Sequence, residues 1–121
     1  MADIKVSLQR AMKVDGALGV ALVDYGSGMC LGTLGNPGFD LELAAAGNTE
    51  VVRAKKNIRD KLGLRDKIED ILITLTGQYH LIRMAGTTTF IYLVLDRTKS
   101  NLALARKELE GVEKQLEIER G

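Results

Sequence analysis

The sequence is poor in the residues that form covalent cross-links, metal sites and catalytic centres. Its 121 residues include one cysteine, one histidine, one proline and no tryptophan. A single cysteine cannot form a disulfide within the chain, which fits a reducing compartment. One cysteine and one histidine cannot make a zinc site without several suitably spaced carboxylates, and no such spacing is present. We therefore expect no metal and no cofactor.

Long apolar runs are also missing. No segment approaches the roughly 18 apolar residues that a membrane-spanning helix needs. The N-terminal MADIKVSLQR is charged and lacks the apolar middle of a signal peptide. The net charge of +1 gives no reason to expect nucleic acid or an anionic membrane as partner. We expect a cytoplasmic protein with no membrane insertion and no bound nucleic acid.

Aromatic residues make up only 4% of the chain, so the core must be built from leucine, isoleucine, valine and alanine. Hydrophobic residues at 45% and charged residues at 27% are the balance of a globular domain. The length suits one domain and is too short for two. We expect a single domain over residues 1–121, with its core between about 4 and 116.

The spacing of apolar residues predicts eight elements. The strand at 88–96 is apolar on both faces, which favours a place in the middle of a sheet. In the strand at 68–76 apolar residues alternate with more polar ones, a pattern typical of a sheet edge. The other predicted strands span 17–24, 29–34 and 79–84, and the predicted helices span 4–12, 41–62 and the C-terminal segment that follows a Ser100 or Asn101 cap.

A glycine-rich stretch, VDYGSGMCLG at Val23–Gly32, invites comparison with a phosphate-binding loop. A dinucleotide fingerprint needs G-x-G-x-x-G between a strand and a helix. Here the third glycine comes one residue late, and a strand follows. The sequence therefore predicts a hairpin turn.

Candidate catalytic groups are isolated. Cys30 would need a nearby base and a lowered pKa to act as a nucleophile, and His80 is the one histidine. Buried cysteine is common, so a core position competes with a catalytic one. Glu69 and Asp70 are adjacent on a predicted strand and so face opposite sides. We expect a protein that is not an enzyme; a small-molecule sensor that uses Cys30 or His80 is a lesser alternative.

The long helix carries a stripe of mostly small residues. Gly47 costs about 1 kcal/mol relative to alanine in a helix interior, so the helix either breaks near Gly47 or packs tightly against something there. The glycine-containing hairpin is a candidate for that neighbour. The stripe consists of Ala44, Gly47, Val51, Ala54 and Ile58.

Charge is unevenly spread along the chain. No lysine or arginine occurs between Val14 and Val52, and a basic segment follows from Arg53 to Lys67. A solvated helix face is one explanation, and a surface for a charged partner is the other. On the second explanation Arg53, Lys56 and Arg59 are candidate partner-facing residues.

The order of elements, together with their residues, resembles the roadblock/dynein light chain family, a branch of the profilin-like α/β sandwiches. The resemblance covers about Ile4 to Leu116. It rests on GALGVALVDYGSGMCLGTLG for the opening hairpin, LELAAAGNTEVVRAKKNIRDKLGL for the long helix and IEDILITLTGQYHLIRMAGTTTFIYLVLD with SNLALARKELE for the remainder. The short single-domain form is most similar to the prokaryotic type.

The resemblance implies a five-stranded antiparallel sheet with the long helix on one face and the two terminal helices on the other. It also implies a homodimer, or a heterodimer with a paralogous domain, and a non-catalytic scaffold or regulator of a small Ras-like GTPase. An adaptor of a larger assembly, working through its sheet edge and final helix, is the alternative. The residues expected at the interface are Ile71 and Ile73 together with the helix stripe.

Overall fold

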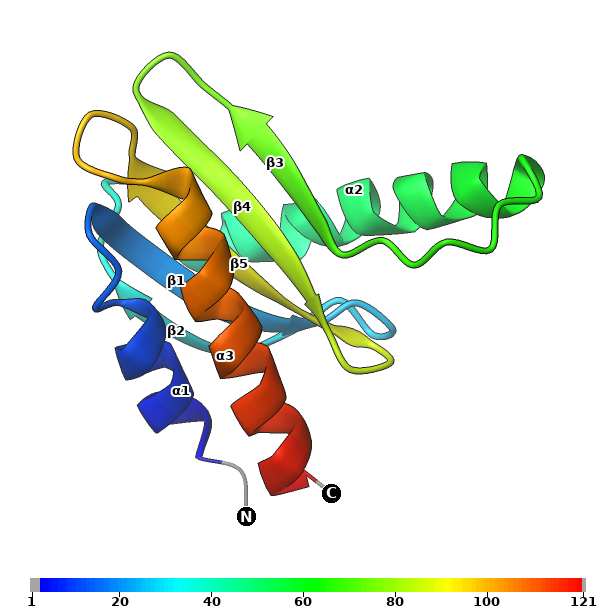
Figure 1. Cartoon of the computed structure of the whole chain (residues 1–121), viewed down its shortest axis with the longest axis horizontal. Coiled ribbons are helices and arrows are strands. Elements are labelled where there is room, and N and C mark those ends of the chain that lie inside the picture. Colours follow the sequence, from blue (N-terminus) through cyan, green and yellow to red (C-terminus); the bar gives the residue numbers. More distant parts are fainter. Residues whose placement is uncertain (1–2, 121) are drawn as a thin grey trace.

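The protein forms one five-stranded antiparallel sheet between helices on both faces (Figure 1). The structure, a computed structural model, describes residues 3–120 and the side chains of residues 3–116; Met1, Ala2 and Gly121 lie outside the described residues. The elements in chain order are α1 (Ile4–Ala11), β1 (Ala17–Asp24), β2 (Met29–Gly35), α2 (Leu41–Lys61), β3 (Asp70–Thr74), β4 (Gln78–Ala85), β5 (Thr89–Asp96) and α3 (Leu102–Arg120).

The strand order is β2-β1-β5-β4-β3, so the strand predicted to lie in mid-sheet is the central one and β3 is an edge. Every residue of β5 but Asp96 is buried. Phe90, Tyr92 and Val94 face one side, and Ile91 and Leu93 face the other. A strand that is apolar on both faces can bury all its side chains only between two helical layers, and β5 lies there.

The two faces of the sheet form two separate cores. On one face α1 and α3 lie side by side and cover Val20, Leu22 and Leu93. On the other face α2 covers Ala21, Val23 and other residues of the same strands. This is the predicted sandwich, and the predicted fold class is confirmed.

The two sheet edges differ. β3 pairs with β4 in regular register from Asp70 to Thr74. In β2 the register shifts, because Leu22 pairs with Gly32 and Val23 with Cys30, which leaves Leu31 as an extra residue. A bulge of this kind twists an edge away from further pairing. The regular open edge is therefore β3.

Some boundaries and one facing were predicted wrongly. β3 covers Asp70–Thr74 rather than 68–76. Leu18 packs on the α2 face instead of sharing the face of Val20 and Leu22. The cause is a register shift between Ala17 and Gly19 where β1 meets β5, which breaks simple alternation at the start of the strand.

The close approach of a helix to the glycine-containing hairpin is made by α1. A methyl group at Gly32 would lie 3.2 Å from the side chains of Ile4 and Leu8. Gly111 plays a similar part in α3, since a methyl group there would clash with the Arg10 guanidinium. That guanidinium donates to Oε1 of Gln115 over 3.2 Å. Two glycines thus set how closely α1 fits its neighbours.

The final helix, α3, packs its apolar face against the protein's own sheet. Ala105, Leu109, Val112 and Leu116 are at most 3% exposed. Arg106 donates to the Asp70 carboxylate over 3.0 Å, which ties α3 to the first residue of β3. The apolar face of α3 is therefore unavailable to a partner, which leaves the adaptor alternative the sheet edge and the exposed side of α3.

Candidate functional site: the projecting end of α2

α2 is continuous from Leu41 to Lys61, so the alternative of a break near Gly47 is excluded. The Asp40 carboxylate accepts from the Leu43 amide over 3.0 Å and caps the first turn. At the other end Gly63 has a φ of 72°, a left-handed conformation that favours glycine, and follows the C-cap Leu62.

The face of α2 on the sheet is not the predicted stripe. The buried residues of the helix are Leu41, Ala45, Thr49 and Val52. Gly47, Ala54 and Ile58 are exposed, and Ala44 and Val51 are half-buried. A methyl group at Gly47 would meet nothing within 4 Å. Close packing of this stripe on the hairpin is therefore wrong, and the stripe lies on a face that the protein itself leaves open.

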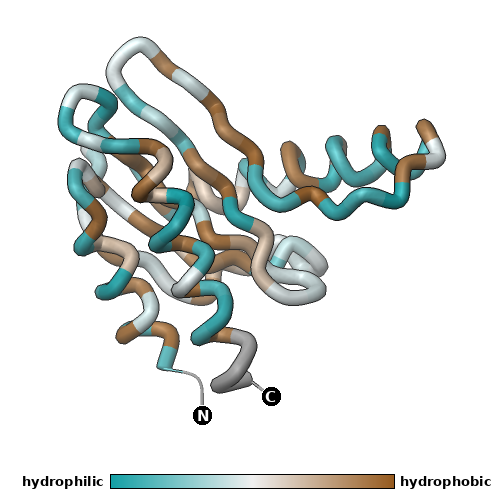
Figure 2. The backbone as a smooth tube through the Cα atoms, in the orientation of Figure 1, coloured by the Kyte–Doolittle hydropathy of each residue, from teal (hydrophilic) through white to brown (hydrophobic). Residues whose placement is uncertain are grey.

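Beyond Val52 the helix leaves the sheet and projects past it (Figure 1). We call residues 53–67, the last turns of α2 and the segment that follows, the α2 arm. No residue of the arm is buried. Ile58, Leu62 and Leu64 are 49%, 67% and 53% exposed, and hydrophobic positions alternate with hydrophilic ones along the arm (Figure 2). Large apolar side chains on a helix with no sheet beneath it are typical of a surface that another molecule covers.

A groove runs between the α2 arm and the chain entering β3. Besides charged side chains, it is lined by Ile58, Leu62, Leu64, Ile68 and Ile71. Ile71 and Ile73, the two strand residues expected at an interface, are half-buried on the α2 face of the sheet. The structure thus places Ile58 and Ile71 in one continuous apolar surface beside the open edge.

Arg53 and Lys56, predicted to face a partner, are bound to Tyr25 in the β1–β2 turn. Arg53 Nε donates to the Tyr25 carbonyl over 3.0 Å, and Lys56 Nζ donates to the Tyr25 hydroxyl over 2.7 Å. The same hydroxyl donates to the Thr87 carbonyl in the β4–β5 turn. These contacts, which we call the Tyr25 tie, hold the base of the arm to two turns at one end of the sheet.

Four other basic residues of the α2 arm make no such contact. Arg59 bonds to Asp60 and to the Asp66 carbonyl. The exposed side chains with no hydrogen bond or ion pair to the described residues are Lys55, Lys61, Arg65 and Lys67. The sequence shows the basic segment but not which of its cations are uncommitted, since only tertiary contacts show which cations are occupied.

Cys30 and His80 do not form a catalytic pair. They lie on β2 and β4, with β1 and β5 between them, so about three strand spacings of roughly 4.8 Å separate them. Burial raises the pKa of the Cys30 thiol, with a backbone hydrogen bond at Gly32 opposing and Glu42 adding to the effect. A raised pKa disfavours the thiolate. The geometry does not support the sensor or enzyme alternative at these residues.

His80 instead belongs to a hydrogen-bonded chain beneath α2. Its Nδ1 lies 3.0 Å from the Tyr92 hydroxyl and its Nε2 lies 2.9 Å from Oε1 of Gln78. Burial lowers the pKa of His80. Burial also raises the pKa of Tyr92 to about 12, although a hydrogen bond with Asn48 opposes the shift. Each group has its partner, which is the usual state of polar groups in a core.

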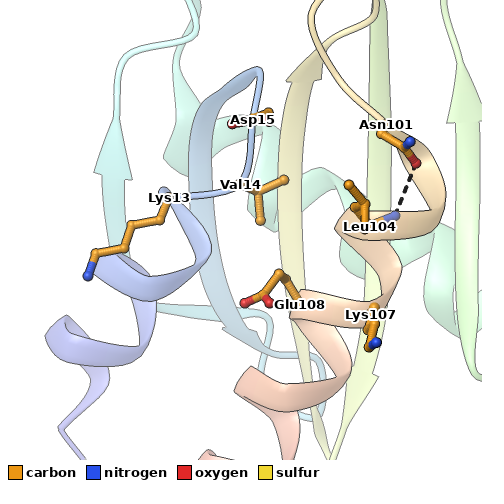
Figure 3. Close-up of a pocket in the computed structure, with 7 residues that line it drawn as sticks. All are labelled: Lys13, Val14, Asp15, Asn101, Leu104, Lys107 and Glu108. Carbon is orange, nitrogen blue, oxygen red and sulfur yellow. Dashed lines mark hydrogen bonds between the residues drawn. The ribbon is translucent and has the colours of Figure 1, made fainter.

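The pocket between α1 and α3 lacks convergent chemistry. The pocket between the end of α1 and the start of α3 is lined by charges of both signs, and its lysines Lys13 and Lys107 extend away from each other (Figure 3). Among the described side chains no three histidine, cysteine or carboxylate groups lie close enough to hold a metal ion. No helix in the described part of the chain has the length and apolarity to cross a membrane.

Comparison with solved structures gives clear likenesses, although no protein-family model matches the sequence and no curated protein matches it. The fold is similar to MglB from Myxococcus xanthus, with a TM-score of 0.85, 18% identity and coverage of 97% of this chain and 94% of that chain. A roadblock/LC7 domain from Streptomyces avermitilis has a similar fold, with a TM-score of 0.83, 13% identity and coverage of 96% of each chain. An MglB structure with a tetrameric arrangement is also similar, with a TM-score of 0.78, 17% identity and coverage of 93% of this chain and 83% of that chain.

These likenesses establish the architecture over nearly the whole chain. The chain has the roadblock fold, and the resemblance expected from its sequence is confirmed at the level of the fold. Identities below 20% carry no residue assignments from those proteins to this one. The functional residues must be argued from this chain's own surface.

Proposed function

We propose that this protein is a non-catalytic homodimeric scaffold that binds a small Ras-like GTPase and modulates its nucleotide cycle or location. The observation that carries the proposal is the α2 arm. It projects from a roadblock fold with exposed Ile58 and Leu62 and with lysines that no described residue neutralises. A monomer gains nothing from exposing such a surface, whereas a protein that works by binding requires one.

The mechanism is complementary surface rather than chemistry. The α2 arm holds seven basic and two acidic residues, while the chain as a whole carries a net charge of +1. A concentrated positive field of this kind accelerates encounter with an acidic surface and orients the partner. The apolar groove beside it supplies the buried contact that holds the complex after encounter.

Capture of purified small GTPases tests the proposal. We expect binding at tens of micromolar or tighter, with one nucleotide state, GDP or a non-hydrolysable GTP analogue, preferred. The double variant Lys55→Glu with Lys61→Glu should weaken capture about tenfold or more, because both lysines are exposed and uncommitted. The matched control is Lys13→Glu with Lys107→Glu, the same charge change on the α1–α3 face.

Two results would count against this function. If no GTPase binds in either nucleotide state, the GTPase part of the proposal is wrong. If both double variants weaken capture equally, the interaction depends on net charge and not on the α2 arm. Light scattering during size-exclusion chromatography tests the dimer separately.

A further inference from the structure

A polar hollow lies at the end of the sheet where the α2 arm begins. It is bounded by the arm, the chain entering β3, the end of β4 and the β4–β5 turn, and its volume is about 910 Å³. We call it the basal hollow. Small-molecule sites in proteins run from roughly 300 to 1,000 Å³. The basal hollow therefore has room for a small ligand.

Four cations from different elements line the basal hollow. Lys56 and Arg59 come from α2, Lys67 comes from the segment that enters β3, and Arg83 comes from β4. These residues are distant in sequence and are brought together by the fold. Several cations around one hollow are typical of a site for an anion that has several oxygen atoms.

Lys56 is already ordered for such a ligand. Its Nζ donates to the Tyr25 hydroxyl over 2.7 Å and lies 4.8 Å from the centre of the Tyr25 ring. An ammonium group has three donors, and the hydroxyl takes one of them. The others remain for a ligand in the hollow. Because the side chain is held in place beforehand, binding to it costs little conformational entropy.

Arg83 is covered by the protein and still has an unused edge. Its side chain is 15% exposed, and its Nε and Nη2 both lie 2.9 Å from Oε1 of Glu113. Nη1 makes no hydrogen bond with the described residues. Donors of a side chain covered to this extent are usually occupied. An anion in the basal hollow would supply the acceptor that Nη1 lacks.

The carboxylates of the basal hollow narrow the choice of ligand. Glu113 is neutralised by Arg83, which leaves Asp66 and Glu69 in the lining. Lys67 is exposed and makes no hydrogen bond or ion pair with the described residues. A free carboxylate repels an anion but accepts from a hydroxyl or amino group. A ligand that carries both kinds of group suits this lining better than a bare anion.

An apolar wall completes the basal hollow. Ile68 and Met84 line it and are half-buried. Ligand sites commonly combine such apolar contacts with a few polar groups that fix the orientation of the ligand. The wall has no counterpart in the needs of a bare anion, so it also favours the organic part of a larger molecule.

We propose that the basal hollow binds a phosphoryl group, with Lys56, Lys67 and Arg83 as its cationic contacts. The group can belong to free phosphate or to an organic phosphate, and the carboxylates and the apolar wall favour the organic phosphate. The inference goes beyond the proposed function, because it concerns a small ligand and holds whether or not a GTPase binds.

Isothermal titration of the full chain tests the ligand class. The probes are inorganic phosphate, pyrophosphate, ADP and adenosine, at equal ionic strength set with sodium chloride. Pyrophosphate and ADP should bind saturably with dissociation constants of about 1 mM or less, and adenosine should not bind. If ADP binds about threefold or more tightly than pyrophosphate, the ligand is an organic phosphate; if not, it is the free anion. The phosphoryl site stands in both cases.

A charge change on one lysine tests the place of binding. Lys67→Glu should weaken ADP and pyrophosphate binding about tenfold or more, and the fold should not change, because Lys67 makes no contact that stabilises it. The matched control is Lys61→Glu, the same change at an exposed lysine of the α2 arm that does not line the hollow. It should change binding less than twofold. In NMR spectra, pyrophosphate should shift the amide signals of residues 83–87 and leave those of α1 in place.

Three results would overturn the inference. One is no saturable binding of pyrophosphate or ADP up to about 10 mM. Another is equal weakening by Lys61→Glu and Lys67→Glu, which would show diffuse attraction to the arm and no defined site. The third is adenosine binding as tightly as ADP. GTPase capture is measured separately, so a protein that binds ADP and captures no GTPase would contradict the proposed function alone.

Discussion

At the scale of single residues, His80 and Tyr92 show how a polar group is accommodated beneath a helix. Tyr92 is fully buried, and its hydroxyl and the His80 ring satisfy one another. The arrangement suits a neutral imidazole, because one ring nitrogen accepts from tyrosine while the other donates to Gln78. A proton added to the ring would convert the accepting nitrogen into a second donor.

The protein should therefore lose stability as the pH falls through the range in which His80 becomes protonated. The pKa of His80 lies below its usual 6.5 in the folded state, so the unfolded chain binds the proton first. The contribution is fully present above about 6.5 and is lost as the pH falls from there through the folded-state pKa. Urea unfolding at several pH values should show this slope in the wild type and a flatter one in His80→Gln. Equal slopes would show that another group is responsible.

Residue-level contacts are also where sequence reasoning reaches its limit. The sequence predicted that Cys30 and His80 lie on strands and excluded a phosphate loop at Gly26–Gly32, because these conclusions depend on local spacing. It did not predict that Lys56 bonds to Tyr25, 31 residues away. Such a contact depends on how α2 crosses the sheet, which no local pattern encodes.

At the scale of elements, the contact between α1 and α3 includes an arginine of one helix that lies over a glycine of the other. Arg10 reaches over α3 at Gly111 and lies 3.7 Å from the Glu108 carboxylate. A glycine in the middle of a helix lowers its stability by about 1 kcal/mol relative to alanine. The cost is offset by the contact that the glycine admits.

A double-mutant cycle should expose this coupling. In the Arg10→Ala background, Gly111→Ala should stabilise the protein by about 1 kcal/mol, because only helix propensity then matters. In the wild-type background the added methyl group must displace the guanidinium, and the gain should vanish or reverse. Thermal and urea unfolding of the four proteins measures it; equal gains in both backgrounds would disprove the coupling.

The position or the ends of an element could be predicted from the sequence where one strong local pattern determined them. β5 is apolar on both faces and lies at the centre of the sheet, and α2 has its N-cap at Asp40 and its glycine at Gly63. The sheet-facing side of α2 was not predictable, because alanine and valine occur on both sides of the helix. Had Leu43 and Leu62 been included, the steps of three and four on the outer face would have been evident.

At the scale of the whole molecule, the Tyr25 tie joins three parts of the chain that are distant in sequence. The β1–β2 turn, the middle of α2 and the β4–β5 turn meet at one tyrosine. The tie lies where α2 passes its last buried residue, Val52. It therefore fixes the direction in which the α2 arm leaves the sheet.

Tyr25→Phe should lower the free energy of unfolding by about 1–3 kcal/mol, since it leaves the Thr87 carbonyl without its donor and the Lys56 ammonium without its acceptor. It should also weaken capture of the GTPase, because the α2 arm is then less firmly positioned. Urea unfolding and capture by immobilised GTPase measure the two effects. The control is Tyr79→Phe, whose hydroxyl makes no hydrogen bond with the described residues and whose removal should change neither. Unaltered capture in Tyr25→Phe would separate the tie from function.

The contrast between the two margins of the sheet limits how large an assembly can grow. A filament built strand upon strand needs two compatible margins on every molecule. Here the extra Leu31 distorts one margin, while β3 keeps a regular ladder. Once two molecules have joined at the regular margin, the new particle offers only distorted ends. Growth by strand addition should then stop at a pair of molecules.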